Sequence, residues 1–357
     1  MRVYFIVYLL TLLLSYLIPV HNQKDYLRKL IFVFMPLFLF GALREGFSDL
    51  DTYEGIYNEI HNLSSFIFDE NAHSEIGYQW LCYIMPSFRA LLVFTAALMC
   101  TAYIVFFYKN VPPKSLALGI TMLFLTGNLS IYFVLSSMRN GIAMSLFILC
   151  FTFWQNRKII PAAVVTLVAM TMHTSAIFSL PLAYFVGRTS KFTKKELFIW
   201  IGAIVFFIVS STTSLIGFIA PFINNYFDRY DSVIELGRET GNTFHPLAAV
   251  GSVTLFGLLA AVINKDSYFT KSDISILRVA MLFSMALIMT ALNARMSQYY
   301  SPLIVAATAI IYARFPSSAL KQAYLWFVVA YVGYFFYLWM MDRWWVYGIY
   351  HSVLGSF

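Results

Sequence analysis

Long apolar segments constrain this chain more than any other feature of its sequence. Many approach the roughly 20 residues that a helix needs to cross the hydrocarbon core of a bilayer, beginning with Val3–Val20, Leu30–Leu43 and Ala90–Tyr108. Of the 357 residues, 60% are hydrophobic and only 11% are charged, whereas a soluble domain is about 25% charged. We therefore expect an integral membrane protein. The first segment is not expected to be a cleaved signal peptide, because it lacks a small-residue cleavage site and another apolar segment follows at once.

The lysines predict how the chain is oriented in the membrane. Under the positive-inside rule, short loops rich in lysine and arginine face the cytoplasm. Every lysine lies in one of six hydrophilic loops, which are Lys24–Lys29, Lys109–Lys114, Arg157–Lys158, Arg188–Lys195, Lys265–Lys271 and Arg314–Lys321. With these loops inside and the breaks between them outside, the chain alternates through about twelve spans.

The external breaks differ in kind, because they hold most of the acidic residues and no lysine. Their strong cations are the arginines Arg44, Arg139, Arg229, Arg238, Arg295 and Arg343. The planar guanidinium fork suits phosphate or carboxylate, whereas lysine is a hydrated point charge. Two interpretations stay open: these arginines recognise an anionic ligand, or they pair with the neighbouring acids.

Two segments depart from simple spans. Ile159–Val186 is one apolar run of about 28 residues with cationic loops on both sides, too long for one upright helix. It must form two short spans or a re-entrant hairpin that turns near "MTMHTSA", which brings His173 close to the outer face. The stretch "EIGYQWLCYIMPSF" is too short to span and contains a proline near its end, so we expect an interfacial or half-inserted helix there.

No internal repeat or low-complexity tract is evident in the sequence. We therefore expect one polytopic domain over residues 1–357, with external caps at about 44–75 and 221–245. The net charge of +7 is concentrated in the membrane loops, so no nucleic-acid partner is expected. Cys82, Cys100 and Cys150 lie in apolar surroundings without CxxC spacing, so we expect packing residues and neither a disulfide framework nor a zinc site.

Four polar groups fall on the external side. The cap sequence "LREGFSDLDTYEGIYNEI" is followed by Glu75, and the other three are centred on Arg139 with Asn140, on His173 in "HTSA", and on Arg295 in "LNARMSQYY". Each group alone is explained as an interfacial loop, a packing histidine or a snorkelling arginine. Their common location on one side favours a shared site.

These segments carry a resemblance. The order "LREGFSDLDTY", "EIGYQW", "SSMRNGIAMS", "MTMHTSAIFSLPL" and "NARMSQYY" resembles the EpsG family of bacterial exopolysaccharide proteins, which is similar to the Wzy-type O-antigen and capsule polymerases. The RNGIA segment followed by HTSA is its most specific part. Where that family often has Gln after the central arginine, this chain has Asn140, so no role is assigned to that side chain.

The resemblance implies an all-α, GT-C-like transmembrane bundle of about twelve spans plus the half-inserted helix, in the bacterial inner membrane with its site facing the periplasm. It implies a glycosyltransferase that joins oligosaccharide repeat units carried on undecaprenyl diphosphate. No metal or other cofactor is implied. The expected partners are the lipid-linked oligosaccharide and the bilayer, together with a chain-length regulator protein and a flippase.

The chemistry assigns roles to the external residues. Negative charge develops on a diphosphate as the glycosidic bond breaks, so fixed cations are needed at the membrane plane. A base must also accept the proton of the acceptor hydroxyl. Arg139 and Arg295, with Arg44, are assigned to bind the diphosphate. The preferred base is His173, because its ordinary pKa is near working pH, and the other base candidates are Glu75 and Asp51. The residues assigned to contact the sugars are Asp49, Tyr53, Tyr78 and Tyr299.

Three other functions stay open. A transporter of the lipid-linked unit would also use arginines against diphosphate, although transporters usually show repeated halves. A membrane O-acyltransferase would need its His or Ser to be reachable from a cytoplasmic acyl donor. A purely structural subunit would leave the lysine-free cationic face unexplained.

Overall fold

The computed structural model describes residues 2–45, 50–68, 74–125, 137–174, 176, 202, 269–270, 273–277, 280, 301–315, 317–347, 351–352 and 355–356. The chain divides into two compact units, Met1–Gly187 with Val305–Phe357, and Arg188–Ile304. In the second unit, Thr270 and Asp273 form a reciprocal cap at the start of a helical segment, 273–277. The Thr270 hydroxyl accepts a hydrogen bond from the Asp273 backbone N–H at 3.1 Å, and the Asp273 carboxylate accepts one from the Thr270 backbone N–H at 2.9 Å. The single domain expected from the sequence stays a prediction.

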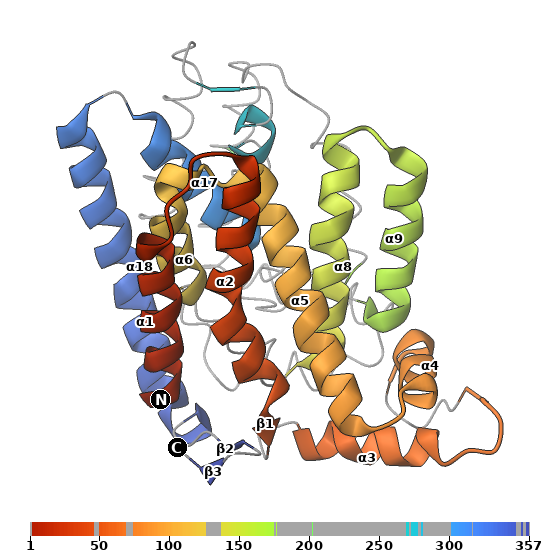
Figure 1. The fold of residues 1–357 in the computed structure, drawn as a ribbon. Coiled ribbons are helices and arrows are strands. Elements are labelled where there is room, and N and C mark those ends of the chain that lie inside the picture. Colours follow the sequence, from red (N-terminus) through yellow and green to blue (C-terminus); the bar gives the residue numbers. More distant parts are fainter. Residues whose placement is uncertain are drawn as a thin grey trace. The chain divides into compact units, whose positions relative to one another are not determined.

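The first unit is built mainly from helices that run side by side, with one helix, α3, lying across an end of the others (Figure 1). The chain order is α1 (Arg2–Leu17), α2 (Gln23–Ala42), β1 (Arg44–Glu45), α3 (Leu50–His61), α4 (Ile76–Ile84), α5 (Phe88–Asn110), η2 (Pro113–Ser115), α6 (Leu116–Leu125), α8 (Met138–Gln155), α9 (Ile159–Met172), α17 (Ser301–Arg314), α18 (Ser318–Tyr347), β2 (His351–Ser352) and β3 (Gly355–Ser356).

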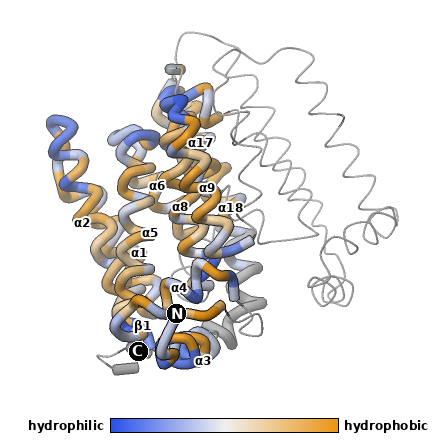
Figure 2. Tube along the Cα trace, turned by 90° about the vertical axis from the view of Figure 1, so that its right-hand side faces the viewer, coloured by the Kyte–Doolittle hydropathy of each residue, from blue (hydrophilic) through white to orange (hydrophobic). Residues whose placement is uncertain are grey.

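The helices of this unit place the lysine-bearing connections at one end, which we call the lysine end. The α1–α2 and α8–α9 connections both lie there (Figure 1). Hydrogen bonds tie the same end together: the Tyr26 hydroxyl donates to the Val111 carbonyl at 2.7 Å, and the Gln155 amide donates to Asn110 Oδ1 at 2.9 Å. Figure 2 shows hydrophobic residues along the helices between more hydrophilic ends, which is the arrangement that a bilayer requires.

The opposite end, which we call the site end, carries α3, α4, the start of α8 and the finish of α9 (Figure 1). Helix α3 is amphipathic and buries Leu50, Tyr53, Ile56, Tyr57 and Ile60, spaced by three and four residues as one face of a helix requires. The structure bears out the two lengths expected from the sequence, whereas the half-insertion of α4 stays a prediction and the second half of the Ile159–Val186 run, from 177, lies outside the described residues. Helix α4 has only 9 residues, and α9 ends at Met172 with His173 as its C-cap.

Within the part of the chain that the structure describes, one helix, α5, is long and apolar enough to cross a membrane by itself. Shorter apolar helices cover Val3–Leu17, Pro113–Leu125, Ile159–Met172 and Pro302–Arg314. The expected number of about twelve spans therefore stays a prediction, because several of those spans lie outside the described residues.

Aromatic and small side chains hold these helices together. Phe34 on α2 stacks on Tyr103 of α5, with ring centroids 6.1 Å apart, and meets Phe107 edge-on. All three cysteines are free and buried, which confirms their expected packing role. Cys150 on α8 lies 3.0 Å from the Ala162 carbonyl of α9.

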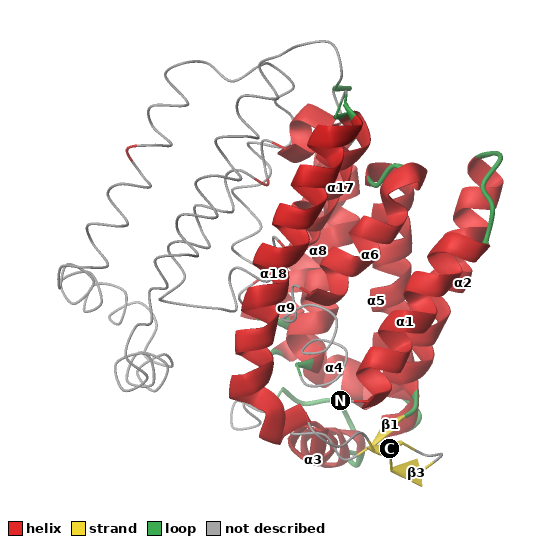
Figure 3. Cartoon of the chain, turned by 90° about the vertical axis from the view of Figure 1, so that its left-hand side faces the viewer, coloured by secondary structure: helices red, strands yellow, loops and turns green. Residues whose placement is uncertain are grey.

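One detail departs from the all-α prediction. Residues Arg44–Glu45 pair antiparallel with His351–Ser352, which in turn pair with Gly355–Ser356, and these strands lie beside the C-terminus (Figure 3). Each strand has only two residues. Backbone groups just beyond a helix end need hydrogen-bond partners, and here the C-terminal segment supplies them to the residues that follow α2.

Candidate functional site

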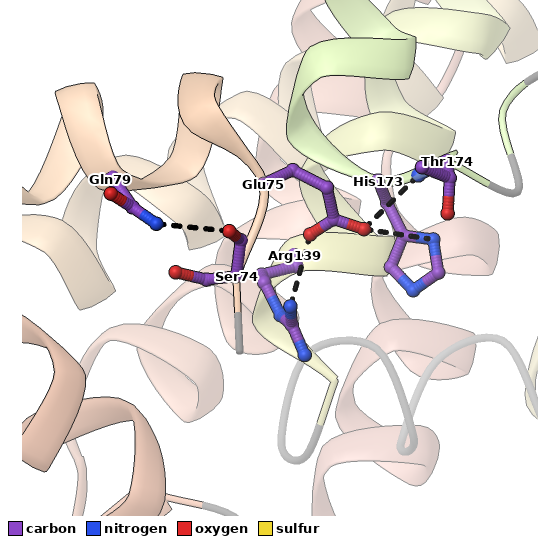
Figure 4. Close-up of polar contacts among 6 residues, drawn as sticks. All are labelled: Ser74, Glu75, Gln79, Arg139, His173 and Thr174. Atoms are coloured by element: carbon purple, nitrogen blue, oxygen red, sulfur yellow. Dashed lines mark hydrogen bonds and ion pairs between the residues drawn. The ribbon is translucent and has the colours of Figure 1, made fainter. Parts of the chain in front are cut away.

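Glu75 joins three elements at the site end (Figure 4). Its Oε2 accepts a hydrogen bond from Arg139 Nη1 at 3.0 Å, and its Oε1 accepts one from the backbone N–H of Thr174 at 3.1 Å. The same Oε1 lies 4.0 Å from Nδ1 of His173. A single carboxylate therefore lies between a guanidinium and an imidazole that the sequence separates by 34 positions (173 − 139).

The backbone around Glu75 is fixed by α4. Glu75 is the N-cap residue of this helix, and its carbonyl accepts the backbone N–H groups of Tyr78 and Gln79 at 3.0 and 3.1 Å. The side chain of Gln79, fully buried, donates to the Ser74 carbonyl at 3.0 Å. These bonds hold the segment that enters the helix, and they orient the Glu75 side chain toward α8 and α9 (Figure 4).

Arg139 lies in the first turn of α8. A cation is unfavourable there, because the helix dipole places partial positive charge at the N-terminus. Two groups offset that cost: the Glu75 carboxylate, and the ring of Tyr53, whose centroid lies 5.9 Å from Arg139 Cζ. Arg139 therefore does not simply extend to the membrane surface; its side chain is 24% exposed and is held in place.

His173 ends α9. Its backbone N–H donates to the Ala169 carbonyl at 3.0 Å, and its carbonyl accepts from the Ala176 N–H at 3.0 Å, so the residue is fixed on both sides. The side chain is buried, and the imidazole faces the Glu75 carboxylate (Figure 4). The helix end near His173 that the length of the apolar run predicted is found, and the position of this end at the external face stays a prediction.

The structure thus brings together five predicted residues: Glu75, Arg139, His173, Tyr53 and, behind Tyr53, Tyr78. Tyr78 is fully buried and meets Tyr53 edge-on with centroids 5.8 Å apart. Burial raises the pKa of the Tyr78 phenol well above its ordinary value. Its assigned sugar contact is corrected, because a neutral, covered ring here supports Tyr53 and offers no surface to a ligand.

Of the other predicted residues, the structure describes Arg44 and Asp51. Arg44 in β1 is only 1% exposed, which contradicts direct contact with a diphosphate in this structure. Asp51 is exposed in the first turn of α3. Asp49, Arg295 and Tyr299, which the sequence also predicted for the site, lie outside the described residues.

Arg89 was missed by the sequence analysis. It lies in the first turn of α5, donates to the carbonyls of Ala42 and Arg44 at 3.1 and 2.9 Å, and forms a 2.7 Å ion pair with Glu45. These bonds tie the end of α2 to the start of α5. The sequence "PSFRALL" contains a pattern that could have indicated it, because a serine before a helical segment is a typical N-cap residue. In the structure Ser87 accepts a hydrogen bond from the Ala90 N–H, which places Arg89 in the first turn of α5 at the site end.

Comparison with known families decides the classification. The EpsG family model matches residues 27–349. The chain belongs to the EpsG family. Comparison with curated proteins and with solved structures gave no match. EpsG-family membership supports a polymerase-like role in polysaccharide biosynthesis, in a membrane and on a lipid-linked sugar.

The arrangement suits acid–base chemistry beside an anion. A carboxylate next to an imidazole orients it and stabilises the imidazolium that forms when the ring accepts a proton. An arginine beside them suits phosphate oxygens. Among the described residues, no three His, Cys, Asp or Glu side chains are grouped so as to hold a metal ion.

Proposed function

We propose that this EpsG-family protein is a polysaccharide polymerase that joins oligosaccharide repeat units carried on undecaprenyl diphosphate, at the periplasmic face of the bacterial inner membrane. The observation that carries the proposal is the Glu75 carboxylate held between Arg139 and His173 at the end of the helices opposite the lysine-bearing connections. This end faces the periplasm if the lysine end is cytoplasmic.

The proposed reaction transfers the growing glycan from one lipid carrier to the next repeat unit. A hydroxyl oxygen of the acceptor sugar attacks the anomeric carbon of the donor. The bond between that carbon and the diphosphate oxygen breaks, and its electron pair stays with the diphosphate. The hydroxyl proton goes to the His173 imidazole, and the products are the extended glycan on the acceptor carrier and free undecaprenyl diphosphate.

Each residue of the cluster has a role in this reaction. Arg139 stabilises the negative charge that grows on the departing diphosphate, because a guanidinium stays charged and donates forked hydrogen bonds. His173 accepts the proton. Glu75 orients the imidazole and stabilises its protonated form; it already accepts two N–H groups, so it is the weaker candidate for the base itself. The contribution of Arg295 to the diphosphate site remains part of the proposal.

The test compares lipid-linked glycan length in cells with and without the protein. We expect long chains in its presence and a single repeat unit on the outer face in its absence, restored by the wild-type chain but not by Arg139→Gln. Arg28→Gln is the matched control, because Arg28 is 74% exposed in the second turn of α2, at the lysine end. Single units trapped inside the cell would instead indicate a transporter, and unchanged long chains would refute the proposal.

A further inference from the structure

Helices α4 and α9 meet at Gly77, directly opposite Thr171. A Cβ at Gly77 would lie 2.8 Å from the backbone oxygen of Thr171 and 2.9 Å from its carbonyl carbon, and still closer to its side-chain hydroxyl. Side-chain carbons essentially never approach other heavy atoms this closely. The two helices are therefore nearer to each other at this point than any residue other than glycine allows.

This close contact adjoins the candidate site on both helices. Gly77 follows Glu75 by two residues, and Thr171 precedes His173 by two. Glu75 reaches the end of α9 through its bond with the Thr174 N–H at 3.1 Å, and its Oε1 lies 4.0 Å from His173 Nδ1. The separation of the two helices at Gly77 therefore determines whether the carboxylate reaches the imidazole.

We propose that Gly77 is a positioning residue: its lack of a side chain sets the spacing of α4 and α9 at which Glu75 orients His173. The catalytic meaning of this spacing rests on the proposed function. The spacing itself is a structural statement that can be tested without any activity.

The structure indicates the size of the effect of adding a methyl group. Ordinary van der Waals contact begins at 3.4 Å, so an alanine Cβ now 2.8 Å from the Thr171 oxygen must move by about 0.6 Å (3.4 − 2.8). A backbone oxygen cannot rotate away as a side chain does, so the helices must separate. A misplacement of about 1 Å costs roughly 100-fold in enzyme rate, and we expect Gly77→Ala to lower kcat by about 10- to 100-fold.

A matched control is available on a neighbouring element. Gly55 also lies inside a helix, α3, and nothing lies within 4 Å of a Cβ added there. Gly55→Ala should therefore leave the rate unchanged. Thr171→Ala is the second comparison: it removes the hydroxyl but leaves the backbone oxygen, so it should not rescue Gly77→Ala.

The pH dependence separates positioning from simple loss of structure. Within the described part of the chain, Glu75 on α4 faces the His173 imidazole, and Arg139 on α8 pairs with that carboxylate. Moving Glu75 away destabilises the imidazolium, so the acid limb of the pH–rate profile should move to lower pH in Gly77→Ala, as in Glu75→Gln. A reduced rate with the wild-type profile, or a wild-type rate, would overturn the proposal.

Cysteine crosslinking tests the spacing independently of activity and of whether Gly77→Ala folds fully. In a cysteine-free protein, a short bifunctional thiol reagent about as long as a glutamate side chain should join Glu75→Cys to Thr174→Cys, because the Glu75 carboxylate reaches the Thr174 backbone. Neither single cysteine should give this product, and adding Gly77→Ala should slow its formation. No crosslink in the pair would overturn the close approach. If Glu75→Gln and His173→Gln both polymerise normally while the crosslink forms, the proposed function fails and the spacing stands.

Discussion

Glu75 and His173 provide the sharpest kinetic prediction, because the structure places them 4.0 Å apart with side chains only 18% and 11% exposed. At this distance and an effective dielectric constant of about 20, the gross attraction between the carboxylate and an imidazolium is about 4 kcal/mol. The Arg139 guanidinium, 3.0 Å from the same carboxylate, offsets part of it. We take about 2 kcal/mol as the net stabilisation, which corresponds to a change in kcat of about 30-fold.

Two single substitutions and their combination turn this estimate into a test. Glu75→Gln keeps an oxygen that accepts from Thr174 but loses the charge, so kcat should fall about 30-fold. His173→Gln should lower kcat by roughly 10²- to 10⁴-fold, which is the usual contribution of a general base. If Glu75 acts only through His173, the double variant should be no slower than His173→Gln alone, because residues that act as a unit are not additive.

The assay is single-turnover transfer in proteoliposomes, with a synthetic undecaprenyl-diphosphate-linked repeat unit as donor and acceptor and with the product ladder measured over time. Thermal unfolding of each variant controls for folding, since Glu75→Gln also removes the ionic partner of Arg139. Multiplied losses in the double variant would show that Glu75 and His173 act independently. Wild-type kcat in His173→Gln would refute the assignment of the base.

Three further predictions follow from the same structure. Arg139→Lys should keep the charge but lose forked hydrogen bonding, so polymerisation should fall strongly at normal protein levels; full activity would indicate that only a charge is needed. A single cysteine at exposed Asn58 in α3 should react with an impermeant thiol reagent added outside and one at exposed Ser318 should not; the reverse labelling would overturn the orientation. His351→Pro should break its pairing with Glu45 and lower the unfolding temperature, whereas an unchanged temperature would show that this sheet adds no stability.

The features that the sequence predicted correctly are those encoded locally. The length of the apolar run after Lys158 required a turn near His173, and α9 ends at that position. The short apolar stretch after Glu75 predicted a helix too short to span, and α4 has 9 residues. The lysines marked one end of the helices, because the cost of placing them in lipid acts at each loop separately.

The features that the sequence did not predict depend on how the helices pack. Glu75 and Arg139 were assigned to different roles, although they form an ion pair across 64 positions of sequence. Nothing local distinguishes a buried tyrosine from an exposed one on a short interfacial helix, and so Tyr78 was assigned to a sugar. Arg44 is likewise buried, and the residues that follow α2 pair with a C-terminal strand; no local pattern indicates either feature.

The charge balance of the cluster explains why one carboxylate serves two neighbours. Arg139 lies in the first turn of α8, where the helix dipole already contributes partial positive charge, so a second cation on His173 would be unfavourable without Glu75 between them. With Arg139 and a protonated His173, the three groups carry a net positive charge. A bound diphosphate reverses that sign and favours the imidazolium. In the proposed reaction, proton transfer to His173 is therefore expected to follow donor binding, which prevents the base from being consumed before a leaving group is in place.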